Sequence, residues 1–298
     1  MASSFSVRKQ FLKAKPAKKK HAEPKPEMTG PKPEKAFVDR INNLAENWKA
    51  RLGPWRNNLK NTRPLLIASD CSGYGSDVIA LRLLGLHREV RSVMTCEKDT
   101  VKVALHRAVS ECCGVEFDET VHRSDIFDRQ DIEFQRPHVY TAGYPCPSYS
   151  KLGKKRGTQD RRGLVTLRGL EYVSSQRPQV VVLEQVSSIL EQRFSKVWHF
   201  ILKILRKLNY SVDYKVMNTK NYGLPQSRPR VYVVAVAAET VRQQVNLPTA
   251  RSDTIDLHTC LDKSKIGSEV LNLPHYYSAP WCYNLCYNQL ILELFIYP

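Results

Sequence analysis

The segment that decides the fold is His138-Val-Tyr-Thr-Ala-Gly-Tyr-Pro-Cys-Pro-Ser-Tyr-Ser150. It begins as an apolar, β-branched and aromatic run, which predicts a strand over His138–Ala142, and it turns at Gly143. Pro145 and Pro147 fix φ on both sides of Cys146 and remove two backbone donors. Open α/β sheets bind ligands beyond the carboxyl ends of their strands. The segment therefore predicts a thiol held at the edge of such a sheet, although most free cysteines are simply small buried hydrophobes.

Strand and helix patterns alternate on both sides of this segment. Apolar and β-branched runs predict further strands at Pro64–Ala68, Val90–Cys96, Val121–Asp125, Val180–Leu183, Val212–Val216 and Val231–Val236. Helical periodicity predicts helices over Val78–Leu84, Thr100–Cys113 and residues 194–208. Strands that alternate with helices favour an α/β fold, with a mostly parallel sheet and helices on both faces.

The composition changes along the chain and divides it into four parts. Residues 1–36 are rich in Lys, Pro and Glu and nearly lack apolar side chains after Leu12, which predicts a disordered basic tail. Residues 37–62 are expected to form an N-terminal helix and a linker. Residues 63–240 contain the alternating pattern and are the predicted catalytic core. Residues 241–298 are an incomplete or atypical C-terminal segment.

The net charge of +17 predicts a polyanionic partner. The lysines of residues 13–20 are typical of nuclear import or nucleic-acid contact, so we expect a nuclear protein, although a solvated charged tail is equally consistent. The Ser-rich, acid-free first residues leave an organelle transit peptide as a lower-ranked alternative. No apolar run is long enough to predict a membrane span, and no obligate protein partner is indicated.

Eight cysteines without a secretory signal favour free thiols in a reducing compartment. Cys260, Cys282 and Cys286, with His258 and His275, follow no common zinc spacing. We therefore expect no metal site.

A glycine turn follows the first predicted strand, in Ser69-Asp-Cys-Ser-Gly-Tyr-Gly-Ser76. Gly73 and Gly75 allow a tight entry into a helix whose first N–H groups can face a ligand. The third glycine of a dinucleotide fingerprint is missing, which disfavours NAD and FAD. Glu97 and Asp125 stand at the ends of the next two strands, where they can meet ribose hydroxyls and an adenine amino group. Together these features predict an adenosine-bearing cofactor.

Three motifs within residues 63–236 resemble the cytosine-5 DNA methyltransferases. They are the Gly-x-Pro-Cys-x-x-aromatic-Ser pattern of residues 143–150, Leu183-Glu-Gln-Val186, and Gln226-Ser-Arg-Pro-Arg230. They occur in the family's order and near its separations. The resemblance implies a Rossmann-like methyltransferase fold, S-adenosylmethionine as cofactor, double-stranded DNA as partner, and transfer of a methyl group to carbon 5 of a flipped cytosine.

The resemblance also implies a role for each site residue. Cys146 is the nucleophile, Glu184 holds ring N3, and Arg228 reaches the pyrimidine oxygen. Arg230 and Gln226 brace the catalytic turn. The cofactor would contact Ser72, Gly73, Tyr74, Gly75, Glu97, Asp125, Ile126 and Pro145. The glycine-containing loop after the nucleophile would bind DNA phosphates through Ser150, Lys151, Lys154, Lys155, Arg156, Arg161 and Arg162.

The sequence departs from the family pattern at three places. Cys71 occupies the usual position of an aromatic residue that stacks on adenine, which implies weaker cofactor binding. Gln185 replaces an Asn, and the family's last motifs are not found in residues 241–298. Two other functions remain open. One is a tRNA cytosine-5 methyltransferase of the same family, and the other is a lapsed methyltransferase fold that binds nucleic acid without turnover.

Overall fold

The computed structural model describes residues 64–83, 86, 90–130, 134–145, 164–222, 226–240 and 247. The predicted basic tail with its lysine cluster, the predicted N-terminal helix, the C-terminal segment and the loop after Cys146 lie outside these ranges. None of the helices within them has both the length and the apolar character needed to cross a membrane.

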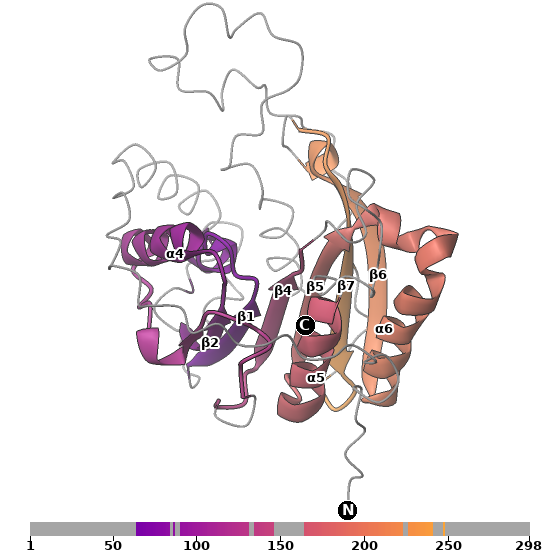
Figure 1. The fold of residues 1–298 in the computed structure, drawn as a ribbon, viewed down its shortest axis with the longest axis horizontal. Helices are drawn as coiled ribbons and strands as arrows, with labels where there is room; N and C mark the ends of the chain where they lie inside the picture. Colours follow the sequence, from indigo (N-terminus) through magenta and orange to yellow (C-terminus); the bar gives the residue numbers. More distant parts are fainter. Residues whose placement is uncertain are drawn as a thin grey trace, which may run out of the picture.

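Seven strands of the described residues form one sheet, in the order β3-β2-β1-β4-β5-β7-β6 (Figure 1). The strands are β1 (Leu65–Asp70), β2 (Val90–Cys96), β3 (His122–Arg123), β4 (Val139–Gly143), β5 (Val180–Val186), β6 (Tyr210–Asn218) and β7 (Pro229–Ala237). The first five run parallel, whereas β7 is antiparallel to both β5 and β6. The strand order reverses between β1 and β4, and such a switch point opens a crevice beyond the carboxyl ends of the strands.

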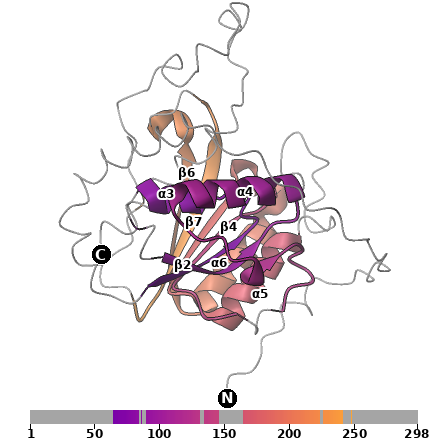
Figure 2. The ribbon, with the colours of Figure 1, turned by 90° about the vertical axis from the view of Figure 1, so that its left-hand side faces the viewer.

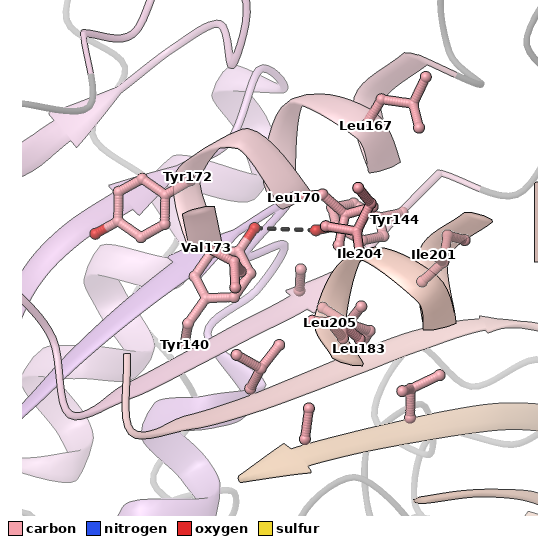
Figure 3. Close-up of a cluster of buried hydrophobic side chains, with 14 of the residues drawn as sticks. Tyr140, Tyr144, Leu167, Leu170, Tyr172, Val173, Leu183, Ile201, Ile204 and Leu205 are labelled. Carbon is pink, nitrogen blue, oxygen red and sulfur yellow. Dashed lines mark hydrogen bonds between the residues drawn. The ribbon is translucent and has the colours of Figure 1, made fainter. Parts of the chain in front are cut away.

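Four α-helices among the described residues cover the two faces of the sheet (Figures 1 and 2). They are α3 (Ser76–Leu83), α4 (Thr100–Cys113), α5 (Val165–Gln176) and α6 (Ser195–Lys207), with short 3-10 turns at Glu119–Val121, Ser187–Leu190, Gln192–Phe194 and Thr219–Tyr222. Helices α5 and α6 pack on one face, over side chains such as Tyr140 and Leu183 (Figure 3). Helix α3 packs on the other face, over Ile67 and Val182, and α4 lies against α3.

These observations confirm the predicted α/β class, with its mostly parallel sheet and helices on both faces. Two strand predictions differ from the structure in ways that bear on the site, and one helix was missed. Strand β3 has only two of the five residues predicted at Val121–Asp125, because a 3-10 turn capped by Asp118 includes Val121 and the strand ends before a bend at Ser124. Strand β5 continues to Val186, because its last residues pair with β7, so Glu184 lies inside the strand. Helix α5 was not predicted.

Candidate active site

The glycine turn leads from β1 into α3 and adopts the tight shape predicted for it. Gly73 has φ +57° and Gly75 φ +77°, which an L side chain rarely adopts. The Ser72 N–H donates to the carbonyl oxygen of Cys96 at 3.2 Å, which attaches the turn to the end of β2. A Cβ on Gly75 would lie 2.9 Å from Nε2 of His106, so a glycine is also needed there for space.

Glu97 directly follows β2, and its carboxylate accepts hydrogen bonds from backbone N–H groups, which the sequence did not indicate. Its Oε2 accepts a hydrogen bond from the Gly73 N–H at 3.0 Å, and its Oε1 accepts from the N–H groups of Lys98 and Asp99 at 2.9 and 3.0 Å. These bonds fix the direction of a carboxylate that is only 9% exposed. Because two carboxylate oxygens offer about four acceptor positions and three are used, the group can still accept from one ribose hydroxyl.

Asp125 lies two residues beyond β3 and not at its end, as the sequence had predicted. Its Oδ1 accepts from the Phe127 N–H at 3.0 Å, and its Oδ2 pairs with Nζ of Lys98 at 3.1 Å. The Lys98 side chain is 75% exposed, so a ligand amino group can displace it at small cost.

Glu97 and Asp125 open into one cavity of about 360 Å³ at the switch point, a size common for small-molecule sites. Of the predicted cofactor residues, Gly73, Glu97, Asp125, Ile126 and Pro145 line it, and Ser72, Tyr74 and Gly75 belong to the turn that borders it. The lining combines fixed acids with apolar side chains such as Phe127 and Val165, so it fits a ligand with an adenine and a ribose.

Glu184 belongs to β5 and lies beside the carboxyl end of β4, next to this cavity. It pairs in register with Gly143, which lines the cavity, and a Cβ on Gly143 would lie 3.7 Å from Oε2 of Glu184. Nε of Arg230 lies 3.0 Å from Oε1 of the same carboxyl, and both side chains are less than 20% exposed. The carboxyl therefore has a defined direction at the root of the predicted catalytic turn.

Two opposing effects act on the Glu184 carboxyl. Burial raises its pKa above the ordinary value of 4.5, and the charges of Arg230 and Arg228 lower it by less. The net rise keeps more of the protonated form, which can donate a hydrogen bond.

Arg228 and Gln226 enter the site from the segment before β7. The Arg228 N–H donates to Oδ1 of Asn218 at 2.9 Å and to Oγ1 of Thr219 at 3.1 Å, and the Gln226 carbonyl oxygen accepts from the Thr219 hydroxyl. These bonds position the backbone of the Gln-x-Arg-x-Arg motif next to Glu184. The predicted brace between Gln226 and the catalytic turn lies partly outside the described residues.

Among the residues that the structure describes, the thiols of Cys71 and Cys96 line the cavity. Burial raises the pKa of both well above 9, with the negative charge of Asp70 as the second cause. They stay protonated at neutral pH and are poor nucleophiles. Cys146 lies outside the described residues, one position after Pro145, as do Ser150 and the six basic residues assigned to DNA contact. Within the described ranges, no cluster of three or more metal-ligand side chains occurs.

Asp70, Arg129, Tyr140 and Tyr144 form a buried polar network beneath the site, which sequence reasoning missed. Arg129 and Asp70 form an ion pair that is fully buried, and the Tyr140 hydroxyl donates to Oδ2 of Asp70 at 2.6 Å. The hydrogen bond between Tyr140 and Asp70 joins residues 70 positions apart, and the four residues carry no common motif.

Comparisons with known proteins agree with the motifs. A family model described as C-5 cytosine-specific DNA methylase matches residues 87–284, more than half of the chain. The type II methyltransferase M.DsaV of Dactylococcopsis salina is 36% identical over 93 residues, 31% of this chain and 26% of that protein. M.SsoII of Shigella sonnei is 30% identical over 142 residues, 47% of this chain and 38% of that protein.

Among solved structures, the S. pombe Dnmt2 methyltransferase superposes with a TM-score of 0.46 and 15% identity, over 61% of this chain and 52% of that one. The chain spans less than half the length of the two curated relatives named above.

Proposed function

This chain belongs to the C-5 cytosine-specific DNA methylase family, and we propose that it transfers a methyl group from S-adenosylmethionine to carbon 5 of cytosine in double-stranded DNA. The observation that best supports this function is the Glu184 carboxyl. It forms an ion pair with Arg230, and the charge of Arg228 also acts on it. It lies against Gly143, and Gly143 precedes Cys146 by three residues.

The chemistry requires a thiolate and a hydrogen-bond donor on opposite parts of one pyrimidine ring. Carbon 5 of cytosine is too weakly nucleophilic to react alone. The Cys146 thiolate would add to carbon 6, and the electron pair of the ring would move towards N3 and the exocyclic oxygen. Glu184 would donate to N3 and Arg228 to the oxygen, so that the developing charge is stabilised.

S-adenosylmethionine, when bound, supplies an electrophilic methyl group on a sulfonium. Gly73, Glu97 and Asp125 would hold its adenosine part in the cavity, and Gly143, which lines the cavity, pairs in register with Glu184 on the neighbouring strand. After carbon 5 takes the methyl group, loss of its proton would expel the Cys146 thiolate and restore the ring.

A base within a duplex cannot reach a thiol at the edge of a sheet, so the target cytosine must be flipped out, at a cost of a few kcal/mol. The basic residues between Lys151 and Arg162 would offset part of this cost by binding phosphates. We also propose that the protein is nuclear and that the lysines of residues 13–20 direct its import.

Covalent trapping tests the function directly. We expect the protein, incubated with S-adenosylmethionine and a duplex that contains 5-fluorocytosine, to form an adduct that survives denaturation, because fluorine blocks the final proton loss. Cys146→Ala should abolish the adduct. Cys112→Ala, which removes a partly exposed thiol of α4, should form it normally.

A duplex that binds without forming an adduct would contradict the enzyme and favour a lapsed nucleic-acid-binding fold. A tRNA tested in parallel would reveal the other substrate class, if it is trapped and the duplex is not.

A further inference from the structure

A buried polar network joins the carboxyl ends of β1 and β4, directly beneath the cavity. The Tyr144 and Tyr140 hydroxyls lie 3.0 Å apart, and the Tyr140 hydroxyl donates to Oδ2 of Asp70 at 2.6 Å (Figure 3 shows the tyrosine pair). Oδ1 of Asp70 pairs with the Arg129 guanidinium. All four residues are at most 3% exposed, so water contributes little to their hydrogen bonding.

The direction of the hydrogen bonds follows from counting protons. A tyrosine hydroxyl has one proton, and that of Tyr140 goes to Asp70, so Tyr144 must donate to the Tyr140 oxygen. Burial, followed by the negative charge of Asp70, raises the pKa of both tyrosines well above 10. Both hydroxyls therefore remain protonated donors at neutral pH.

Arg129 is held from three sides. Besides its ion pair with Asp70, its guanidinium lies 4.5 Å from the ring centroid of Tyr172, and its carbonyl oxygen accepts from the Arg168 guanidinium at 2.6 Å. Tyr172 and Arg168 both belong to α5. The Asp70 carboxylate thus has a rigid partner and gives the tyrosines a fixed acceptor.

Gly169 of helix α5 leaves room for the hydroxyl groups of Tyr140 and Tyr144. A Cβ on Gly169 would lie 2.7 Å from the Tyr140 hydroxyl oxygen and closer still to that of Tyr144. Only a glycine at this position allows both hydroxyls to approach the helix so closely.

The two ends of the network coincide with the two functional turns. Asp70 directly precedes Cys71, which has φ +53° and starts the glycine turn of the cofactor cavity. Tyr144 lies between Gly143 and Pro145, both of which line that cavity, and two residues before Cys146. A purely structural contact at this place could be made by apolar side chains, without the cost of burying an ion pair.

We propose that Tyr144 and Asp70 are positioning residues, which hold the nucleophile turn and the cofactor turn at a fixed separation through Tyr140. This inference rests on the proposed function and assigns it two further residues. Displacing reacting groups by about 1 Å can cost on the order of 100-fold in rate, so the loss of one hydroxyl should be measurable.

Tyr144→Phe tests the proposal, because it removes only the hydroxyl that begins the network. Tyr210→Phe is the matched control. Its hydroxyl is also buried and donates to the Pro178 carbonyl oxygen at 2.5 Å, at the opposite end of β5. Both variants lose one buried hydrogen bond, so a merely structural role predicts similar thermal midpoints and similar activities.

We expect Tyr144→Phe to lower the single-turnover rate of methyl transfer about tenfold or more, with less than a twofold change in the KM for DNA. The rate at which iodoacetamide alkylates Cys146, followed by peptide mass spectrometry, should change about fivefold or more. Tyr210→Phe should match the wild type in all three. Equal behaviour of the two variants would overturn the proposal.

The alkylation experiment tests this proposal independently of the proposed function on which it rests. If the wild-type protein methylates nothing and forms no adduct, the proposed function fails. The alkylation of Cys146 in Tyr144→Phe then still shows whether the network controls the turn, since that reaction needs neither cofactor nor DNA.

Discussion

At the scale of single residues, the protonation of Glu184 gives the site a testable pH dependence. Burial raises the pKa of this carboxyl above 4.5, against the opposing charges of Arg230 and Arg228. If the protonated carboxyl donates to ring N3, the rate of adduct formation should fall as the pH rises through that raised pKa. Glu184→Gln should remove this alkaline fall and lower the maximal rate on the order of 100-fold, as the loss of a general acid does.

The pH profile of trapping with the 5-fluorocytosine duplex measures this effect. Glu119→Gln is a suitable control, because Glu119 also pairs with an arginine, Arg107, but both side chains are largely exposed and precede β3. A profile for Glu184→Gln that keeps the wild-type alkaline limb would show that another group controls it.

Some of the site residues could be predicted from sequence, for a simple reason. Glu97 and Asp125 follow parallel strands, and the ends of parallel strands meet at one edge of the sheet. The hydrogen bond from the Gly73 N–H to Glu97 could not be predicted, because it depends on how two turns meet in space. The hydrogen bond between Tyr140 and Asp70 could not be predicted either, because in the sequence one is an ordinary acidic residue and the other an ordinary aromatic residue of a strand.

At the scale of elements, α5 shows where sequence patterns fail. The helix is buried on nearly all sides from Val165 to Val173, including Arg168 and Thr166. An amphipathic stripe, the usual sign of a helix, arises only when one face meets water. Helix α6 has such a stripe and was predicted, whereas α5 has a glycine at its centre and no continuous polar face.

The glycine at the centre of α5 provides a prediction about stability. Gly169→Ala should lower the free energy of unfolding by about 1–3 kcal/mol, because the new methyl group would overlap the Tyr144 and Tyr140 hydroxyls in a filled core. Denaturant unfolding followed by circular dichroism measures it.

Gly143→Ala is the comparison, since a Cβ there meets its nearest neighbour at an ordinary 3.7 Å and should change stability little. If Gly169→Ala is as stable as Gly143→Ala, the tyrosine hydroxyls do not occupy the space assigned to them.

At the scale of the whole molecule, three histidines from different elements should make the fold sensitive to acid. Burial lowers the pKa of His106, His122 and His138 below 6.5, with the charge of Arg136 adding to the effect at His138. In the unfolded chain these rings take up protons near pH 6.5, whereas in the folded protein they do so only at lower pH. The free energy of unfolding should therefore decrease as the pH falls below about 6.5, and remain level with respect to these groups above it.

His138→Asn isolates one of the three contributions. Nδ1 of His138 accepts from the Leu66 N–H at 2.9 Å, a role that an asparagine oxygen can take over without titrating. Unfolding measured between pH 5 and 8 should show a shallower acid slope in this variant than in the wild type. His199→Gln, on the exposed face of α6, serves as the control. Equal slopes for all three proteins would exclude His138 as a source of the acid sensitivity.

The pairing of β5 with β7 limits how this sequence can change in length over evolutionary time. Glu184 stands opposite Tyr232 and Val186 opposite Arg230, so the carboxyl and the guanidinium are diagonal neighbours on one face of the sheet. Adding or deleting one residue between Arg230 and Tyr232 would turn Arg230 to the opposite face and leave Glu184 without its cation. Lineages that keep the reaction should therefore gain and lose residues in the connection between β6 and β7, and preserve the spacing from Arg230 to Tyr232.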